Sequence, residues 1–360
     1  MPSLDLRRNE IVVGVDTHKD EHVAVALDGI GGSRGSYALP ATPEGYAGLY
    51  AWAQAQGRVV AFGVEGTGSY GSGLARFLRR HGATVYEVSR PPRRGERRAS
   101  GKSDLVDAEH AARQVLSGEA AAVPKATDGS VEVLRLIKIA RDTAVKSRTQ
   151  AMIALKSALV TAPDELRSEL EGLSDFRLIT ACAALSDELP AEPASAVRYV
   201  LRSLAIRWLA LHEEIKGHAR YLKQITEETA PQLTARFGIG FDCAAELLVA
   251  AGDNSDRIRS EAAFAKLCGV CPIPASSGRT TGRHRLNRGG NRQANAALYR
   301  IVIVRLRWHP PTIDYVARRT AEGLTKKEII RCLKRYVARE VYRLLPRSAK
   351  QDARDLANAA

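Results

Sequence analysis

The first 120 residues alternate between two spacings of apolar side chains, and this pattern limits the fold more than any other feature of the sequence. Five apolar runs have the length of strands, at residues 11–15, 22–27, 35–39, 59–64 and 83–88. Helical patterns separate the last three runs, at residues 42–56 and 69–81. Strand-length runs that alternate with helical segments predict a mixed α/β sheet, with a further helix expected at residues 104–116.

Beyond residue 130 the spacing becomes helical throughout. Residues 131–233 are rich in Ala, Leu, Lys, Arg and Glu and are interrupted near Pro163 and around residues 190–193, which predicts a helical arm of coiled-coil type. We therefore predict an α/β plus α fold in four parts. These are an α/β domain at 8–125, a helical linker or coiled-coil region at 126–234, a mostly helical domain at 235–345 and a disordered tail at 346–360.

The charge balance points to a polyanionic partner. Lysine and arginine number 54 against 40 acids, for a formal net charge of +14. Each phosphate that such cations neutralise releases counterions, so nucleic acid is the first candidate. The sequence has no run of about 18 apolar residues that would span a membrane, and its five scattered cysteines do not form a disulfide framework. We expect a cytoplasmic protein.

Four acidic residues stand where a metal site could form. Asp16 and Glu65 each follow directly on an apolar run, while Asp104 and Asp107 are spaced to share one face at the start of a helix. Mg²⁺ prefers oxygen ligands, and four carboxylates could hold two ions for phosphodiester cleavage. Any one of these acids alone is explained more simply as a cap, a turn residue or a solvated strand end.

The stretches that contain these acids resemble a known family. They read Val-Gly-Val-Asp-Thr-His-Lys at 13–19, Val-Glu-Gly-Thr-Gly-Ser-Tyr at 64–70 and Lys-Ser-Asp-Leu-Val-Asp-Ala at 102–108. They are similar to the DEDD transposases of the insertion-sequence family numbered 110, which are related to the Piv DNA invertase. The resemblance implies an N-terminal RuvC-like domain of the RNase H type. It also implies that Asp16, Glu65, Asp104 and Asp107 are catalytic ligands of Mg²⁺ or Mn²⁺.

A second candidate site lies in a basic region near the C-terminus. No carboxylate occurs between Glu261 and Asp314, whereas nine lysines and arginines do, and clustered cations are the usual footprint of nucleic-acid binding. We expect this positive field to need an external anion. Within it, Ser276 and Ser277 precede a glycine in a loop; taken alone, this is more typical of turn chemistry than of catalysis, and no pattern shows a general base.

The same family resemblance extends to this basic region. Gly-Val-Cys-Pro at 269–272, Ser-Gly at 277–278, Gly-Arg at 282–283 and Arg-Gly-Gly-Asn-Arg at 288–292 are similar to its C-terminal transposase domain. The resemblance implies that Ser277, rather than Ser276, attacks a DNA phosphate. It further implies a dimer or tetramer in which the metal site of one subunit meets the serine domain of another. It also implies a non-coding bridge RNA that pairs with donor and target DNA, and a place at the nucleoid.

Further residues are candidates for binding nucleic acid. A basic loop leads into Asp104, and a Gly-Ile-Gly turn before an apolar helix resembles a helix-hairpin-helix. The candidates are Arg93, Arg94, Arg97, Arg98, Lys102, Gly238, Gly240, Arg279, Arg283, Arg285, Arg288 and Arg292. The middle region carries further cations on what we expect to be a mostly positive surface, which could serve RNA binding or subunit pairing: Lys138, Arg141, Lys146, Arg148 and Lys156.

Together these features predict a transposase that cleaves and rejoins DNA strands with four metal-binding carboxylates and a serine nucleophile. Two alternatives remain open. One is a structure-specific nuclease of the RuvC-like type, which would need the carboxylates and water but no serine. The other is a non-catalytic protein that binds nucleic acid and uses these acids only structurally.

Overall fold

The computed structural model describes residues 7, 9–88, 103–187, 189–274, 284–285 and 289–346. Its contacts divide the chain into two compact units. The first contains Met1–Gly129, Ala251–Ser260 and Arg347–Ala360, and the second contains Ser130–Ala250 and Glu261–Pro346. The four-part division drawn from the sequence stays a prediction.

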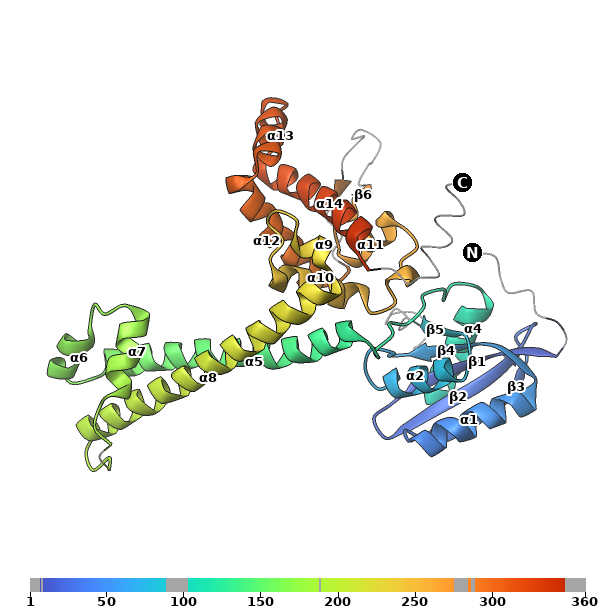
Figure 1. Ribbon diagram of the computed structural model, residues 1–360. Coiled ribbons are helices and arrows are strands. Elements are labelled where there is room, and N and C mark those ends of the chain that lie inside the picture. Colours follow the sequence, from blue (N-terminus) through green and yellow to red (C-terminus); the bar gives the residue numbers. More distant parts are fainter. Residues whose placement is uncertain are drawn as a thin grey trace. The chain divides into compact units, whose positions relative to one another are not determined.

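A five-stranded sheet forms the centre of the first unit, with the strand order β3-β2-β1-β4-β5 (Figure 1). The strands are β1 (Glu10–Thr17), β2 (Glu21–Asp28), β3 (Ser33–Pro40), β4 (Arg58–Glu65) and β5 (Val85–Val88). The first three form an antiparallel meander, whereas β4 runs parallel to both β1 and β5. This arrangement confirms the mixed sheet that the apolar spacing predicts.

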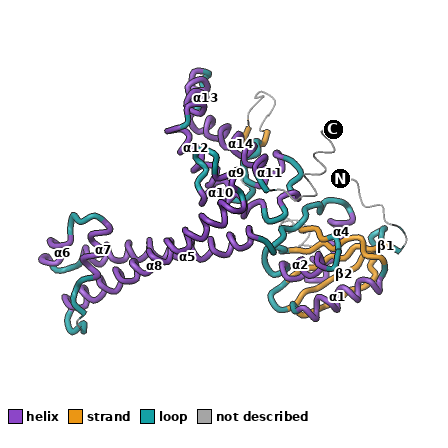
Figure 2. The backbone as a smooth tube through the Cα atoms, in the orientation of Figure 1, coloured by secondary structure: helices purple, strands orange, loops and turns teal. Residues whose placement is uncertain are grey.

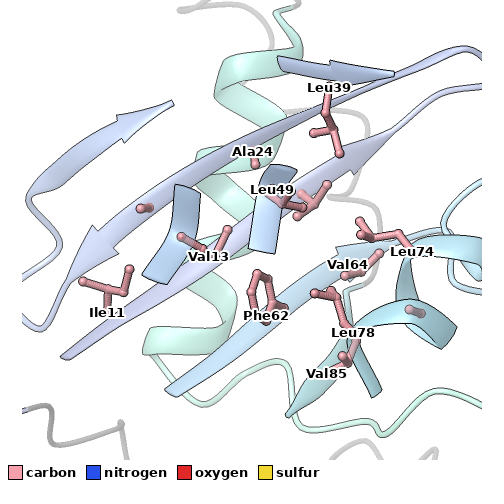
Figure 3. Packing of buried hydrophobic residues seen from close by; sticks show 14 residues of the cluster. Ile11, Val13, Ala24, Leu39, Leu49, Phe62, Val64, Leu74, Leu78 and Val85 are labelled. Carbon is pink, nitrogen blue, oxygen red and sulfur yellow. The ribbon is translucent and has the colours of Figure 1, made fainter. Parts of the chain in front are cut away.

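Side chains alternate between the two faces along every strand, so both faces of this sheet carry apolar side chains. Helices cover both faces and bury these side chains. Helices α1 (Pro43–Gln56) and α2 (Ser72–Arg80) cover one face, where Val13, Phe62 and Leu74 are buried (Figure 3). Helix α4 (Asp104–Leu116) covers the other face and buries its alanines against Val12 and Ala61.

The local sequence explains where these helices begin. Helix α1 starts at Pro43, and the Thr42 side chain caps it by accepting a hydrogen bond from the Gly45 N–H at 3.2 Å. Helix α4 has the bounds expected from the sequence. Helix α2 begins three residues later than expected, because a turn starting at Gly66, with φ of +63°, carries the chain on to Gly71.

The second unit is almost entirely helical in its described residues (Figure 2). Helices α5 (Ser130–Val160) and α8 (Pro193–Thr229) pack side by side along an extended arm, as the helical spacing predicts. Two short helices lie between them in the sequence, α6 (Asp164–Leu170) and α7 (Asp175–Ala183). None of the described helices combines the length and apolar character needed to cross a bilayer.

The rest of the second unit contains a short hairpin of β6 (Ile273–Pro274) and β7 (His284–Arg285). Its helices are α9 (Pro231–Thr234), α10 (Phe241–Ala251), α11 (Glu261–Leu267), α12 (Arg292–Trp308), α13 (Pro310–Ala321) and α14 (Lys326–Leu344). Residues Ala251–Ser260, which include a single 3₁₀ turn at Ser255–Arg257, return to the first unit. There Asn254 bonds the backbone of residues 124 and 126, accepting from the Ala126 N–H at 2.7 Å and donating to the Pro124 carbonyl at 2.9 Å.

Candidate active site

Two of the predicted carboxylates end neighbouring parallel strands on the same face of the sheet. Strands β1 and β4 pair with Val15 opposite Val64, so Asp16 and Glu65 are the next residues on each. Gly14 and Gly63, two positions earlier, both face α4. Because the side-chain period of a strand is two, Asp16 and Glu65 point to that same face.

A close helix–sheet contact brings the other two carboxylates to this edge. A Cβ atom added to Gly14 would lie 2.1 Å from the Ala108 carbonyl oxygen and 2.2 Å from the Ala112 nitrogen, so only glycine fits there. Helix α4 therefore rests directly on β1. Asp104 and Asp107 occupy its first turn, where the helix dipole favours negative charge.

The electrostatics of Asp16 show that all four carboxylates interact. Asp16 is only 6% exposed, and its pKa is raised, chiefly by burial and further by the charges of Glu65, Asp107 and Asp104. The neighbouring His18 acts in the opposite sense. A buried carboxylate with three further acids around it forms a donor set that suits a divalent cation, because the cation offsets both the burial of Asp16 and the repulsion that Asp16 meets.

His18 joins this cluster, and our sequence reasoning did not single it out. Its Nε2 atom lies 3.1 Å from Asp16 Oδ2 and 3.3 Å from Asp104 Oδ1. One ligand atom from each of these three residues lies within 4.8 Å of the other two. The available signal was its place two residues after Asp16, just beyond the strand that positions the carboxylate.

The predicted serine site lies largely outside the described residues. Ser277 and its neighbour Ser276 belong to that part, as do Arg279, Arg283 and Arg288. The two-stranded hairpin pairs Pro274 with His284 and so closes the base of the loop that carries them. Arg285 lies in β7, and Arg292 is the exposed first residue of α12, next to the Asn291 cap.

The other residues predicted to bind nucleic acid lie partly outside and partly within the described residues. Arg93, Arg94, Arg97, Arg98 and Lys102 lie outside the described residues. The glycine turn is described: Gly238 has φ of +77°, and its position is held by Arg305, which donates from Nε to the Phe237 carbonyl at 2.9 Å. Gly240 has no heavy atom within 4 Å of an added Cβ, so its surface side is open.

Two arginines of the basic region are paired with acids elsewhere in the chain and so do not add to the positive field that we expect to need an external anion. Arg305 is buried and paired with Glu340, at 2.7 Å between Nη1 and Oε2. Arg300 pairs with Asp242 at 3.1 Å. Both acids lie outside the acid-free stretch of sequence and reach it only through the fold, which is why the sequence could not show the pairing.

The helical arm corrects a similar expectation. Lys138 is buried and pairs with Glu246 at 3.0 Å and Asp242 at 3.3 Å, so it is not part of a positive surface. Arg141 also pairs with Asp242, at 3.0 Å. Further along the arm, Arg148 covers the ring of Trp208, and Lys156 pairs with Asp175.

Two models of known protein families match this chain. The family model for DEDD transposases of the IS110 type, described as Transposase, matches residues 13–162. The model described as Transposase IS116/IS110/IS902 family matches residues 230–317. The chain belongs to this transposase family. The first match includes all four carboxylates, and the second includes the serine loop.

Two curated relatives come from insertion elements of Streptomyces. An uncharacterized 43.6 kDa protein of insertion element IS110 from Streptomyces coelicolor is 30% identical over 133 residues, which span 36% of this chain and 33% of the relative. An uncharacterized 44.8 kDa protein of element IS116 from Streptomyces clavuligerus is 24% identical over 92% of this chain and 94% of its own length. A DEDD domain of this family implies the use of a divalent metal ion.

Proposed function

We propose that this chain is a metal-dependent DNA transposase that cleaves and rejoins strands, with Ser277 as nucleophile. The observation that carries the proposal is the convergence of Asp16, Glu65, Asp104 and Asp107 at one sheet edge. The strand order and the antiparallel β1–β3 meander beside parallel β4 and β5 are compatible with the RuvC-like, RNase H type of domain. A nuclease without a serine step would share this site, so the serine decides between the two.

The proposed chemistry is a transesterification at phosphorus. The Ser277 hydroxyl oxygen attacks a backbone phosphate and forms an O–P bond, while one bridging P–O bond breaks and its electron pair leaves with the departing sugar oxygen. The serine proton passes to a base, and the departing oxygen takes up a proton. When bound by the four carboxylates, Mg²⁺ or Mn²⁺ would supply charge stabilisation for this displacement.

Rejoining follows from the same covalent link. A hydroxyl of a second strand attacks the phosphoserine, which reforms a phosphodiester and returns the serine oxygen without an external energy source. We also propose that a dimer or tetramer provides the two sites in trans, and that a bridge RNA pairs with donor and target DNA. Both proposals rest on the resemblance of the sequence motifs to the family.

Trapping the covalent link tests the serine. The full chain is incubated with Mn²⁺ and a DNA substrate nicked beside the cleavage point, so that the released fragment diffuses away and the link accumulates as a band that resists SDS. We expect Ser277→Ala to abolish this band and strand joining, by at least about 10³-fold, and the matched Ser276→Ala to keep both. Asp16→Asn should abolish cleavage as well.

Each contrary result has a distinct meaning. A Ser277→Ala protein that still joins strands would reject the serine nucleophile and favour the nuclease. If Asp16→Asn retained full cleavage, the carboxylates would have only structural roles. Guidance is tested separately, by expressing the chain with its flanking element DNA and sequencing the RNA that copurifies; random cellular RNA would reject a bridge RNA.

A further inference from the structure

A cationic cavity lies beside the carboxylate edge, and neither the sequence motifs nor the proposed mechanism uses it. It has a volume of about 150 Å³. One wall is formed by a single face of α2, where Ser72, Arg76, Arg79 and Arg80 recur at helical spacing. The buried side of the same helix carries Leu74 and Leu78, so these arginines face away from the core.

The segment at residues 125–128 adds a fourth cation to the lining of the cavity. Lys125 and Asp128 line it, which leaves four cationic side chains against one carboxylate. Thr67 also lines the cavity; it is 6% exposed, and its hydroxyl has no hydrogen-bond partner among the described residues. Because Thr67 lies two residues after Glu65, the same short loop borders the cavity and the carboxylate cluster.

The α2 arginines differ from three other arginines of this unit, which are paired with acids. Within the described residues, Arg76, Arg79 and Arg80 form no ion pair. By contrast, three arginines elsewhere in the unit are each paired with an acid: Arg34 with Asp28, Arg58 with Glu10, and Arg113 with Glu109. A wall of guanidinium groups without acidic partners is suited to phosphate, which they bind with two parallel hydrogen bonds.

The length of the arginine face indicates an extended ligand. The arginine face runs from Ser72 to Arg80, about 12 Å along a helix at roughly 1.5 Å per residue. This length exceeds a single phosphate group. We propose that the cavity holds the phosphodiester backbone of the nucleic-acid strand that passes the carboxylate cluster. The inference rests on the proposed function only for which strand is bound, not for the binding itself.

Metal-free binding tests this assignment. Fluorescence anisotropy of the full chain is measured in EDTA, with labelled single strands of 20 nucleotides, as DNA and as RNA of the same sequence, from 50 to 300 mM salt. On a single strand, each phosphate that the protein no longer neutralises lowers the slope of log K against log salt by about 0.7. The triple variant R76Q/R79Q/R80Q should therefore lose about 2 from the slope and about 100-fold in affinity at 0.1 M salt.

A control with the same change in net charge makes the result specific. R34Q/R58Q/R113Q removes three arginines of the same unit from positions already paired with acids, and we expect less than about 3-fold loss. R76K/R79K/R80K keeps the charge and should restore the slope. Equal losses in the two glutamine variants would overturn the proposal, since only net charge would then matter.

The DNA measurement, the RNA measurement and the tests of the metal site answer separate questions. A loss in the DNA arm, the RNA arm or both supports the cavity and identifies the strand that it binds. The binding is measured in EDTA and without cleavage, so it depends neither on a bound metal ion nor on Ser277. If the proposed roles of the metal or of Ser277 were rejected, the binding of a strand in the cavity would therefore be unaffected. If the cavity proposal were rejected, the proposed roles of the metal and of Ser277 would be unaffected.

Discussion

His18 is the residue whose position adds most to the carboxylate site. Its Nε2 atom is within hydrogen-bonding distance of both Asp16 and Asp104, so a cation held by these acids would have an imidazole beside it. Mg²⁺ prefers oxygen ligands and gains little from an imidazole nitrogen, whereas Mn²⁺, a first-row transition ion, accepts one more readily. The residue is therefore a candidate determinant of which metal the site takes.

We expect His18→Ala to weaken Mn²⁺ binding by about 10-fold and Mg²⁺ binding by much less, since only the softer ion gains from the nitrogen. Calorimetry measures both affinities, and pulsed electron paramagnetic resonance of bound Mn²⁺ should show coupling to a nitrogen nucleus in the unaltered chain. His110→Ala is the matched control, because His110 lies on α4 without a hydrogen bond or ion pair among the described residues. If the coupling persisted in His18→Ala, His18 would not be a ligand.

Local sequence patterns placed each of these carboxylates at the end of a strand or the start of a helix. They did not show that the four lie close together, which only the family resemblance implied. Asp16 and Glu65 could be placed at strand ends because apolar runs mark strands locally. Their convergence depends on the parallel pairing of β1 with β4, between segments about 50 residues apart, for which no local pattern exists. His18 was overlooked for the same reason, since its second neighbour, Asp104, is distant in sequence.

At the scale of elements, the contact between β1 and α4 determines whether the site forms. A Cβ atom at Gly14 would clash with the backbone of Ala108 and Ala112, which cannot move without the whole helix. The first turn of α4, with Asp104 and Asp107, would move with it. One methyl group on a residue that is not itself a candidate ligand would thus move two of the carboxylates.

We expect Gly14→Ala to lower the free energy of unfolding by about 2 to 3 kcal/mol, as overpacking typically does, and to weaken Mn²⁺ binding at the same time. Gly68→Ala is the control, because an added Cβ there meets no heavy atom within 4 Å. Chemical denaturation and calorimetry measure the two effects. Unchanged metal affinity in a destabilised Gly14→Ala protein would show that α4 adjusts without moving its first turn.

Ion pairs hold α5, α10 and α12 together. The sequence patterns did not predict these pairs. Asp242 on α10 forms ion pairs with Lys138 and Arg141 of α5 and with Arg300 of α12. Burial alone would raise the pKa of Asp242, but the three cations outweigh it and hold the pKa below its usual 3.8. The sequence placed Lys138 and Arg141 on a free surface because Asp242 lies about 100 residues further along the chain.

This network gives a pH dependence with a definite sign. A carboxyl with a lowered folded pKa contributes stability above the unfolded pKa of 3.8 and loses it as the pH falls through the folded value. We expect Asp242→Asn to destabilise the chain by about 2 to 4 kcal/mol at pH 7 and pH 5, and by progressively less below pH 4. Urea unfolding across this range measures the difference.

The exposed pair of Asp175 with Lys156 provides the control. Both of its side chains are more than half exposed, so Asp175→Asn should cost no more than about 1 kcal/mol at any pH. A penalty for Asp242→Asn that stayed constant down to pH 3 would show that shape, rather than charge, makes the network stabilising.

At the scale of the whole molecule, the path of the chain between the two units matters more than any one contact. Residues Ala251–Ser260 leave the second unit and return to the first, where the Asn254 side chain bonds two backbone groups. Neither composition nor helical spacing marks this segment, because its assignment depends only on distant contacts. The extended arm, in contrast, follows from the apolar repeat of α5 and α8.

We expect Asn254→Ala to leave one amide and one carbonyl of residues 124–126 without their partners, at a cost of about 1 to 3 kcal/mol. Hydrogen exchange should therefore accelerate in peptides that cover residues 118–129 and stay unchanged in α8. Gln224→Ala, which removes a single exposed bond to Glu228, is the control and should alter neither region. Equal exchange in both variants would show that the returning segment does not hold this edge.

The returning segment also limits how such proteins can be recombined with one another. A chimera with a single crossover near residue 129 would join the sheet of one parent to the Asn254 segment of another, so the sheet would lose the segment that evolved with it. An exchange that keeps the first unit intact has to carry residues 251–260 along with the sheet. Natural recombination and protein engineering therefore meet the same constraint, because the α/β unit is not encoded by one continuous stretch of gene.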